Sequence, residues 1–523
     1  MIINDIMIVG GGSSGWMTAA LLLKEFPNKN ITLIESPNIQ TVGVGESTLL
    51  HIRRWSSLLG IDDRDFLPHT DGNFKLSLRF KDFYLKGDDG FHYPFGDGDF
   101  ENNVAGYNDW YLKKALYPDT SCSDLADCIW PTMAMVNQNK LFYNDDVPPQ
   151  LPDFRFDRCT AYQFDATKFG LWLRDFYCIP RGLTHIKEHI DTIEQDENGI
   201  KSLNNKHKAD LYIDCTGFSS VLFDKTLNVP FEDYSHMLIN NSAWATKIPY
   251  KNKAEQLVLY TNNTAIDNGW VWEIPLWSRM GAGYVYSNKF IDDDSALEQF
   301  KNWLSKKKQY AEFVKNDELE YKKIPMRIGI HERLWEKNVV AMGLAAAFVE
   351  PLQSTGLFTV QEFGLFLVRE LQRGRISQWD RDNYTFACKM AYRELADFVS
   401  LDYVLSHRDD TEYWKHYLNK EWENSLINLI PKYHVGFFVQ ANRRRKKFEY
   451  FLEGGIPPLA AGMNYGPTDY PTMRYYNFFS EKEAYEQWNP HVIKLNEKKK
   501  RWNEIVSEAP NLYDFMKTHY YHE

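Results

Sequence analysis

The first forty residues carry the hydrophobic pattern of a strand, a turn, a helix and a second strand. Residues 6–9 form a short apolar run, which is typical of a strand buried on both faces. A glycine turn follows, and residues 17–26 have the apolar, alanine-containing character of a buried helix. A second apolar run ends at Glu35. This order predicts a βα unit of a parallel sheet.

Two later segments repeat the change from an apolar strand to a glycine turn. Residues 211–220 form a strand that closes on Asp214 and Gly217. Residues 338–357 form another strand and a small-residue turn, and an apolar helix begins near Phe358. Strand-to-glycine elements this far apart indicate a nucleotide-binding domain interrupted by insertions. The chain is therefore expected to be an α/β protein.

Two further strands have patterns that allow more than one interpretation. Apolar residues at positions 74, 76, 78 and 80 alternate with polar ones at 75, 77, 79 and 81, which by itself predicts a half-buried strand with Lys75 in water. In NGWVWEIPL, residues 268–276, Trp270 and Trp272 lie on one face of a strand. Core packing is the ordinary explanation for such a pair, and a wall between two compartments is the alternative.

Composition excludes several classes of protein. With 523 residues, 44% hydrophobic and 25% charged, the chain is expected to fold as a globular protein of two or three structural units. The net charge of −11 argues against nucleic-acid and membrane partners, and we interpret the basic run at 443–447 as a solvated helix face or a local salt-bridge partner. Six cysteines without a C-x-x-C pair argue against disulfides and against a metal site. The absence of a signal peptide and of a membrane-spanning run predicts a cytoplasmic protein.

The first glycine turn has the spacing of a dinucleotide-binding motif. Gly10, Gly12 and Gly15 form G-x-G-x-x-G, in which the glycines permit a tight turn, close approach of pyrophosphate and close helix packing. The helix N-terminus then presents free N–H groups and a positive dipole end to phosphate. Glu35, twenty residues after Gly15, is placed to accept ribose hydroxyls. NAD and FAD share this motif, and the later strand-to-glycine elements favour FAD.

Several segments, in order, are similar to those of flavin-dependent halogenases related to tryptophan halogenase. They are GGGSSGWM, GEST at 45–48, AYQFDA at 161–166, NGWVWEIP, GLAAAFVEPLQSTG and LSHRDDTEYW at 405–414. NGWVWEIP matches the family's G-W-x-W-x-I-P signature in full. The resemblance covers roughly residues 1–415.

The resemblance implies a mixed α/β fold, with an FAD-binding, Rossmann-like domain of the flavoprotein monooxygenase type, an inserted β-rich substrate region and a mainly helical C-terminal part. The FAD-binding domain is expected to be discontinuous, over 1–74, 156–225 and 335–375. The substrate-binding and halogenation region is expected over 75–155 and 226–334, and the helical part over 376–523.

The resemblance also implies a two-component reaction on a small electron-rich aromatic, such as an indole or a phenol. A separate flavin reductase supplies FADH2, which reacts with O2 to give a flavin hydroperoxide. Chloride, bromide or iodide attacks this peroxide, and the resulting hypohalous acid moves through an internal tunnel to a lysine next to the substrate. The flavin supplies the oxidation, while the protein separates the two sites and excludes water.

Matching the family's motifs residue by residue assigns the roles around the lysine. Lys75 lies in NFKLSLRF, which is similar to the strand that carries the family's lysine, and burial would lower its pKa and favour the free amine. Ser354, Thr355 and Gly356 match the halide-binding turn, although Ser and Thr at a helix start are also ordinary N-caps. Gln353 stands where tryptophan halogenases carry a glutamate, and an amide cannot act as a base at neutral pH.

The remaining assignments concern the cofactor and the substrate pocket. The residues expected to contact FAD lie on glycine turns and strand ends: Gly10, Gly12, Ser13, Ser14, Gly15, Trp16, Glu35, Gly43, Glu46, Asp214, Gly343, Gly356 and Leu357. The residues expected to line or bound the substrate pocket are His92, Phe95, Trp270, Trp272 and Pro351. No match is found for the contacts that tryptophan-specific members make with the amine and carboxylate of the amino acid, so free tryptophan is not the expected substrate.

Two other functions remain open on this evidence. A flavin-dependent hydroxylase would use the same hydroperoxide directly, but it needs an open path that Trp270 and Trp272 argue against. A catalytically degenerate FAD-binding protein is the third candidate, because Gln353 replaces the glutamate. The sequence allows a homo-oligomer without specifying one.

Overall fold

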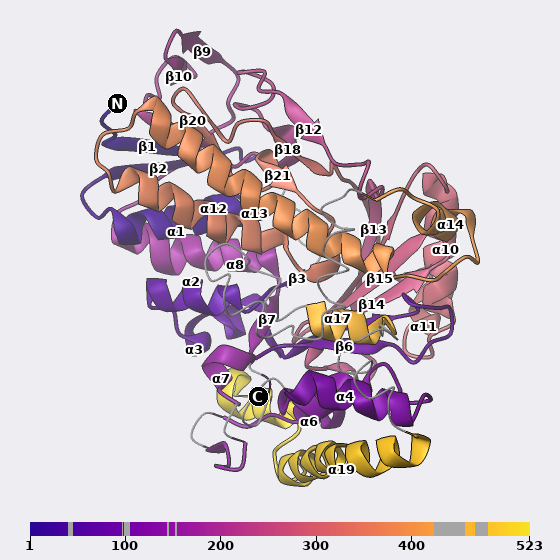
Figure 1. The fold of residues 1–523 in the computed structure, drawn as a ribbon. Coiled ribbons are helices and arrows are strands. Elements are labelled where there is room, and N and C mark those ends of the chain that lie inside the picture. The colour runs from indigo at the N-terminus through magenta and orange to yellow at the C-terminus, as the bar shows by residue number, and fades with distance from the viewer. Residues whose placement is uncertain are drawn as a thin grey trace.

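The computed structural model describes residues 1–39, 45–96, 98, 105–143, 146–151, 154–422, 456–465 and 480–522. Two large sheets lie next to each other, and long helices cover the first of them (Figure 1). This arrangement confirms the mixed α/β fold that the sequence predicts.

The first large sheet has six strands in the order β19-β20-β11-β1-β2-β8. The strands are β19 (Trp335–Glu336), β20 (Val339–Ala341), β11 (Leu211–Asp214), β1 (Asp5–Val9), β2 (Asn30–Glu35) and β8 (Thr184–Lys187). Neighbouring strands are parallel except for β19, which is antiparallel to β20. All six come from the ranges that the sequence assigns to the FAD-binding domain, while the domain boundaries themselves stay a prediction.

Helices from distant parts of the chain pack on this sheet. Helix α1 (Ser13–Glu25) contacts α8 (Ala166–Trp172) and α12 (Gly356–Leu371), and α12 contacts the long helix α13 (Gln378–Val404). In Figure 1, α12 and α13 run side by side across the face of the sheet, with α1 next to them. The apolar residues of α1 and of α12 are buried, so the central strands are shielded from water.

The second large sheet has seven strands in the order β17-β13-β16-β15-β14-β5-β6. They are β17 (Tyr321–Pro325), β13 (Ser242–Pro249), β16 (Arg279–Tyr286), β15 (Gly269–Pro275), β14 (Tyr260–Ile266), β5 (Ser77–Lys81) and β6 (Phe91–Pro94). The pairs are antiparallel except β14–β5, which is parallel. Every residue of β15 is buried, so this strand lies inside the protein on both of its faces.

Three small sheets connect these parts. They are β3 (Glu46–Ser47), β7 (Ala161–Phe164) and β4 (Asn73–Lys75); β12 (Phe231–Asp233), β18 (Gly329–His331) and β21 (Ala347–Phe348); and β10 (Gly199–Leu203) with β9 (Ile193–Asp196). Strand β4 pairs with β7, whereas β5, only one residue further on, pairs with β14 and β6. The chain therefore crosses from one sheet to another at Leu76, directly after Lys75.

The C-terminal part is helical where it is described, as the sequence predicts. Its helices are α13, α14 (Glu412–Leu418), α17 (Ile456–Gly462), α19 (Glu481–Val506) and α20 (Leu512–Met516). Helix α19 packs on α4 (Ala105–Leu116), α5 (Asp124–Ile129) and α6 (Thr132–Gln138) at the bottom of the view in Figure 1. The other helices are α2 (His51–Leu59), α3 (Asp63–Phe66), α7 (Phe156–Cys159), α9 (Lys253–Gln256), α10 (Asp293–Ser305) and α11 (Ala311–Lys315).

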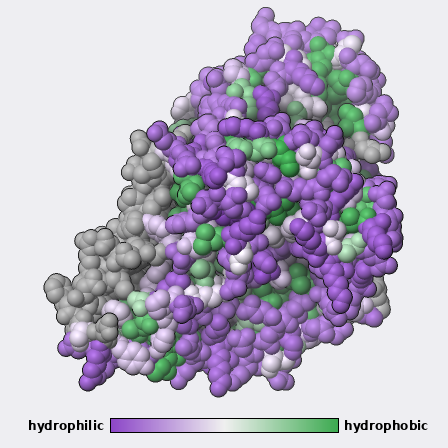
Figure 2. Space-filling view, turned by 90° about the vertical axis from the view of Figure 1, so that its right-hand side faces the viewer, coloured by the Kyte–Doolittle hydropathy of each residue, from purple (hydrophilic) through white to green (hydrophobic). Residues whose placement is uncertain are grey.

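The surface in Figure 2 is dominated by hydrophilic residues, with hydrophobic ones in small separate groups. Within the described ranges, no helix is both long and apolar enough to cross a membrane. The same ranges contain no group of three or more His, Cys, Asp or Glu side chains arranged to hold a metal ion.

Candidate active site

The turn after β1 has a shape that only glycine fits. Gly10 has a φ of +114°, in the left-handed region. A Cβ on Gly15 would lie 2.0 Å from the carbonyl oxygen of Gly10, and one on Gly11 would lie 1.5 Å from a carboxylate oxygen of Glu35. Helix α1 then begins without a side-chain cap on its first N–H groups. A turn without side chains, an uncapped helix start and an acid beside them fit the pyrophosphate and ribose of FAD.

The side chains at the start of α1 hold the helix in place. The Ser13 hydroxyl donates to the carbonyl of Ala166 at 2.9 Å, and Trp16 is fully buried. Ser14 lies against Gly343, where a Cβ would come within 2.2 Å of the serine oxygen. These residues bring the glycine turn against α8 and against the turn after β20. Contacts of these residues with FAD are predicted from the sequence alone.

Asp214 holds the loop that follows β11. Its carboxylate accepts hydrogen bonds from Thr216 N and Oγ1, Leu222 N and Phe223 N, at 2.6–2.9 Å. Because these four donors belong to its own loop, Asp214 shapes the backbone at this edge of the sheet, and its contact with FAD stays a prediction. Gly43, the other strand-end residue assigned to FAD, lies outside the described residues.

Lys75 is completely buried at the junction of two sheets. Its Nζ donates to the carbonyl of Thr48 at 3.0 Å and to Ser354 Oγ at 2.9 Å, and it lies 5.0 Å from the centre of the Phe95 ring. The alternation of apolar and polar residues, taken alone, predicts Lys75 in water, and that interpretation is wrong. The reason is that the strand breaks at Leu76, so Lys75 and the residues after it belong to different sheets.

Burial changes the acid–base properties of Lys75 and of the nearby Glu46. Desolvation lowers the pKa of Lys75 well below its usual value of 10.5, and the negative charge of Glu46 opposes this shift only in part. Desolvation likewise raises the pKa of Glu46 to about 7, again opposed by the charge of Lys75. The uncharged amine of Lys75 is therefore far more accessible at neutral pH than it would be in water.

The turn before α12 is strained and faces Lys75. Ser354 has a left-handed backbone, with a φ of 59°. Its hydroxyl accepts from Lys75 and lies 3.1 Å from Ser47 Oγ, to which it donates. Thr355 is the N-cap residue of α12 but makes no side-chain cap, and its hydroxyl is buried without a partner among the described residues. The N-cap interpretation is thus wrong for both side chains. The start of α12 at Gly356 is left open toward Glu46, whose carboxylate would lie 3.6 Å from a Cβ at this glycine.

Gln353 contacts a carboxyl group that the sequence did not single out. Its Nε2 donates to Asp402 Oδ2 of α13 at 2.7 Å, and both side chains are buried. Glu350, three residues earlier, is bound to Tyr403 and Asn240 at 2.5 and 2.7 Å, and burial raises its pKa to about 7. No spacing rule connects position 353 with a residue 49 positions later near the end of a long helix, so Asp402 carried no local signal.

Trp270 and Trp272 pack against each other inside the protein. They are 1% and 8% exposed, and their ring centres are 6.1 Å apart at an angle of 57°. Gly283, opposite on β16, leaves room for the Trp272 ring, because a Cβ there would lie 2.1 Å from Trp272 Cζ2. Both tryptophans belong to the main hydrophobic core, which confirms the ordinary core interpretation. The barrier between two compartments stays a prediction.

The predicted pocket strand brings His92 and Phe95 to the same region. His92 Nδ1 lies 2.9 Å from Ser77 Oγ, and its ring meets Tyr260 edge-on. Desolvation lowers the pKa of His92 to about 3, so the imidazole is neutral. Phe95 is buried over Lys75, while Pro351 is half-buried at the start of the turn before α12.

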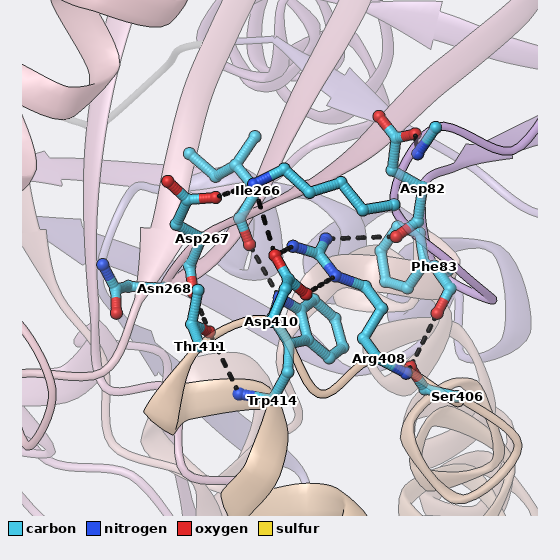
Figure 3. A network of polar contacts seen from close by, with 12 residues as sticks. Asp82, Phe83, Ile266, Asp267, Asn268, Ser406, Arg408, Asp410, Thr411 and Trp414 are labelled. Carbon is cyan, nitrogen blue, oxygen red and sulfur yellow. Dashed lines mark hydrogen bonds and ion pairs between the residues drawn. The ribbon is translucent and has the colours of Figure 1, made fainter.

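A polar network ties the LSHRDDTEYW segment to the second sheet (Figure 3). Arg408 is 2% exposed and donates to both carboxylate oxygens of Asp410 at 2.8 Å, and also to the carbonyl of Asp82 at 3.1 Å. Trp414 Nε1 donates to the carbonyl of Ile266 at 2.8 Å. These bonds join the α13–α14 connection to the β5–β6 loop and to the turn between β14 and β15.

A parallel sheet with a glycine turn that fits FAD, and a buried lysine where a small sheet meets a second large one, are the features of an FAD-dependent enzyme of the flavoprotein monooxygenase fold. The family model described as tryptophan halogenase matches residues 5–475. The chain thus belongs to the tryptophan halogenase family and is a flavin-dependent halogenase. Enzymes of this family use FAD, act on small aromatic substrates and need a separate flavin reductase.

Several relatives are similar over nearly their whole length. Tryptophan 6-halogenase SttH of Streptomyces toxytricini is 31% identical over 482 residues, covering 87% of this chain and 88% of that protein. The VirX1 apo structure is 32% identical with a TM-score of 0.84 over 100% of both chains. Xcc4156, a flavin-dependent halogenase from Xanthomonas campestris, is 26% identical with a TM-score of 0.83 over 99% of both chains.

Proposed function

We propose that this protein halogenates an indole- or phenol-like arene with hypohalous acid that Lys75 holds against the substrate, and that O2 and a halide ion are the co-substrates. When bound, reduced FAD would supply the electrons that activate O2, and O2 is the oxidant that converts the halide to hypohalous acid. The observation that carries the proposal is the fully buried Lys75, hydrogen-bonded to the turn before α12.

Lys75 acts as the hydrogen-bond donor to the hypohalous acid. In its ammonium form Nζ carries three N–H groups, of which two are donated to Thr48 O and Ser354 Oγ and the third can be donated to the oxygen of the acid. This bond weakens the O–X bond as the arene carbon takes the halogen. The released hydroxide combines with the proton lost by the arene carbon, so one arene and one hypohalous acid give one haloarene and one water. Gln353 serves as a hydrogen-bonding group, because an amide is not a base at neutral pH.

The other site residues prepare this step without reacting. The Ser47 and Ser354 hydroxyls fix the position of the ammonium or amine of Lys75. Ser354, Thr355 and Gly356 would receive the halide at the open start of α12, where N–H groups favour an anion. Trp270 and Trp272 would separate the arene from the flavin and let only the small hypohalous acid pass.

The test combines purified protein with a flavin reductase, NADH, FAD, O2 and catalase. Indole and 4-methylphenol are offered with chloride, bromide and iodide separately, and product masses are recorded. We expect halogenated product from the wild type and at least about a hundredfold less from Lys75→Met, which keeps the volume but removes the donor. The control variant Lys86→Met removes an exposed lysine of the β5–β6 loop and should keep activity.

The other two functions make different predictions in the same assay. Hydroxylated product that does not depend on halide would identify a hydroxylase. FAD binding with no turnover of any arene would identify a catalytically degenerate protein. Halogenation that persists in Lys75→Met in the presence of catalase would contradict the role of the lysine.

A further inference from the structure

Two buried oxygen atoms of one side-chain pair have no hydrogen-bond partner among the described residues. They are Gln353 Oε1 and Asp402 Oδ1, the atoms left over when Gln353 Nε2 donates to Asp402 Oδ2 at 2.7 Å, and neither finds a partner in the described part of the chain. Gln353 is 1% exposed and Asp402 is 0% exposed. Burying a polar atom without a partner costs free energy, and such atoms are rare in native proteins. A ligand with polar atoms of its own would remove this cost.

One side of the Gln353–Asp402 pair adjoins the catalytic lysine. Gln353 directly precedes Ser354, whose hydroxyl accepts the 2.9 Å hydrogen bond from Lys75 Nζ. The left-handed backbone at Ser354 turns the chain between these two residues. The amide of Gln353 and the amine of Lys75 are thus held by the same short turn.

Asp402, the other member of the pair, is linked to Lys75 through aromatic residues. Asp402 lies close enough to Tyr93 that its negative charge contributes to a raised tyrosine pKa, after the larger effect of burial. The Tyr93 ring centre is 6.2 Å from that of Phe95 and 6.0 Å from that of Phe398. Phe95 in turn lies 5.0 Å from Lys75 Nζ. Two routes thus connect the pair with Lys75, one through the Ser354 turn and one through Tyr93 and Phe95.

The surroundings of Asp402 favour its protonated form. The carboxyl is fully buried, its described partner is a neutral amide, and Glu350 is a second acidic group nearby. Burial and the charge of Glu350 together raise the pKa of Asp402 well above its usual value, although the Gln353 hydrogen bond opposes them. Because Oδ2 accepts from Gln353, the proton belongs on Oδ1. The pair then offers one acceptor, Gln353 Oε1, beside one donor, Asp402 Oδ1–H.

We propose that Gln353 and Asp402 form a recognition pair for the hydroxyl group of a phenol-type substrate. Gln353 Oε1 accepts the phenolic proton, and Asp402 Oδ1–H donates to the phenolic oxygen. An indole N–H satisfies only the glutamine oxygen, and an aryl ether satisfies only the aspartic acid. The proposal rests on the halogenation function above and narrows its substrate class.

The first test compares two ligands of nearly equal shape. The FAD-loaded protein is titrated by calorimetry with 4-methylphenol and with 4-methylanisole, which lacks the donor. We expect the phenol to bind about tenfold more tightly or better, since the ether leaves a buried acceptor unpaired. Indole is expected to fall between them. Equal dissociation constants for phenol and ether, or tighter binding of indole than of phenol, would overturn the recognition pair.

The second test uses variants of the pair. Asp402→Leu and Gln353→Leu should each lose the preference for the phenol, whereas Asp402→Asn should keep it, because its amide N–H replaces the acid proton. Ser400→Ala is the matched control on α13, since its hydroxyl bonds only within the helix, to Ala396 O at 2.8 Å. An Asp402→Asn variant that behaves like Asp402→Leu would contradict the neutral acid.

Turnover is measured in parallel, so that the two proposals can fail separately. Selective phenol binding without halogenated product in any halide contradicts the proposed function and supports the recognition pair. Halogenated product together with equal binding of phenol and ether supports the proposed function and contradicts the pair.

Discussion

Several ionisable side chains of this protein have lost water without gaining an ion pair. Lys75 is bound to a carbonyl and a hydroxyl, Asp402 to an amide, and Glu350 to a phenol and an amide. Burial therefore shifts the pKa of each group toward its neutral form, because these neutral partners compensate only part of the cost of burying a charge. Groups whose charge is suppressed suit the proposed chamber, in which an uncharged hypohalous acid would meet an uncharged arene.

The raised pKa of Glu350 makes a prediction about stability. The folded protein holds this proton up to about pH 7, whereas the unfolded chain releases it near the usual value of 4.5. The contribution of Glu350 to stability is thus present below the unfolded pKa and lost as the pH rises through about 7. From pH 4.5 to 8 the wild type should lose about 3 kcal/mol relative to Glu350→Gln, from a shift of roughly 2.5 pKa units.

This prediction is measured by urea unfolding of both proteins across that pH range. Glu504→Gln, an exchange at an exposed site on α19, is the control and should follow the wild type at every pH. A constant difference between wild type and Glu350→Gln would show that the carboxyl is already ionised in the folded protein.

At the scale of elements, the site is held by short connections that lie far from it in sequence. Arg408 joins the α13–α14 connection to the β5–β6 loop, and Trp414 joins α14 to the turn before β15 (Figure 3). Strands β5 and β6 follow Lys75 and carry His92, and β15 carries both tryptophans. The LSHRDDTEYW segment is therefore a structural clamp on the walls of the proposed chamber.

The clamp predicts that a substitution at Arg408 lowers the free energy of unfolding much more than a substitution at the nearby Lys86. Arg408→Met should lower the free energy of unfolding by about 2–4 kcal/mol, since it removes both hydrogen bonds to the Asp410 carboxylate and the one to the carbonyl of Asp82. Lys86→Met, which removes the exposed ion pairs to Asp267 and Asp410, should cost less than about 1 kcal/mol. Chemical denaturation of the two variants checks this order, and equal effects would contradict the clamp.

At the scale of the whole molecule, Lys75 and the glycine turn that is predicted to bind FAD belong to different sheets. The glycine turn belongs to the six-stranded sheet, and Lys75 lies where the chain leaves the small β3-β7-β4 sheet for the seven-stranded one. The start of α12 lies near both parts of the site. The Glu46 carboxylate lies beside Gly356, the first residue of α12, and Ser354, in the turn before the helix, accepts a hydrogen bond from Lys75. Binding of FAD and reaction of the arene should thus be separable by mutation.

This separation can be measured with two variants. Gly15→Ala would place a Cβ 2.0 Å from Gly10 O, so the turn must shift, and FAD affinity should fall by about tenfold or more. Lys75→Met should bind FAD as the wild type does while losing halogenation. Flavin fluorescence gives both affinities, and circular dichroism confirms that each variant is folded. A loss of FAD binding in Lys75→Met would show that the two sites are not independent.

Local patterns in the sequence determined the class of fold and predicted the place of the cofactor. The glycine turn, its strands and its helix lie within forty residues, and their spacing is dictated by backbone geometry that no distant contact has to supply. The NGWVWEIP motif likewise predicted a buried strand and pointed to the family that the comparisons show.

Only the tertiary structure decided the chemistry of individual side chains. The burial of Lys75 follows from a change of sheet at Leu76, which alternation along one strand cannot reveal. The contact of Gln353 with Asp402 joins residues 49 positions apart. A pKa depends on the water and charge that surround a group, and these are set by segments that meet only when the chain is folded.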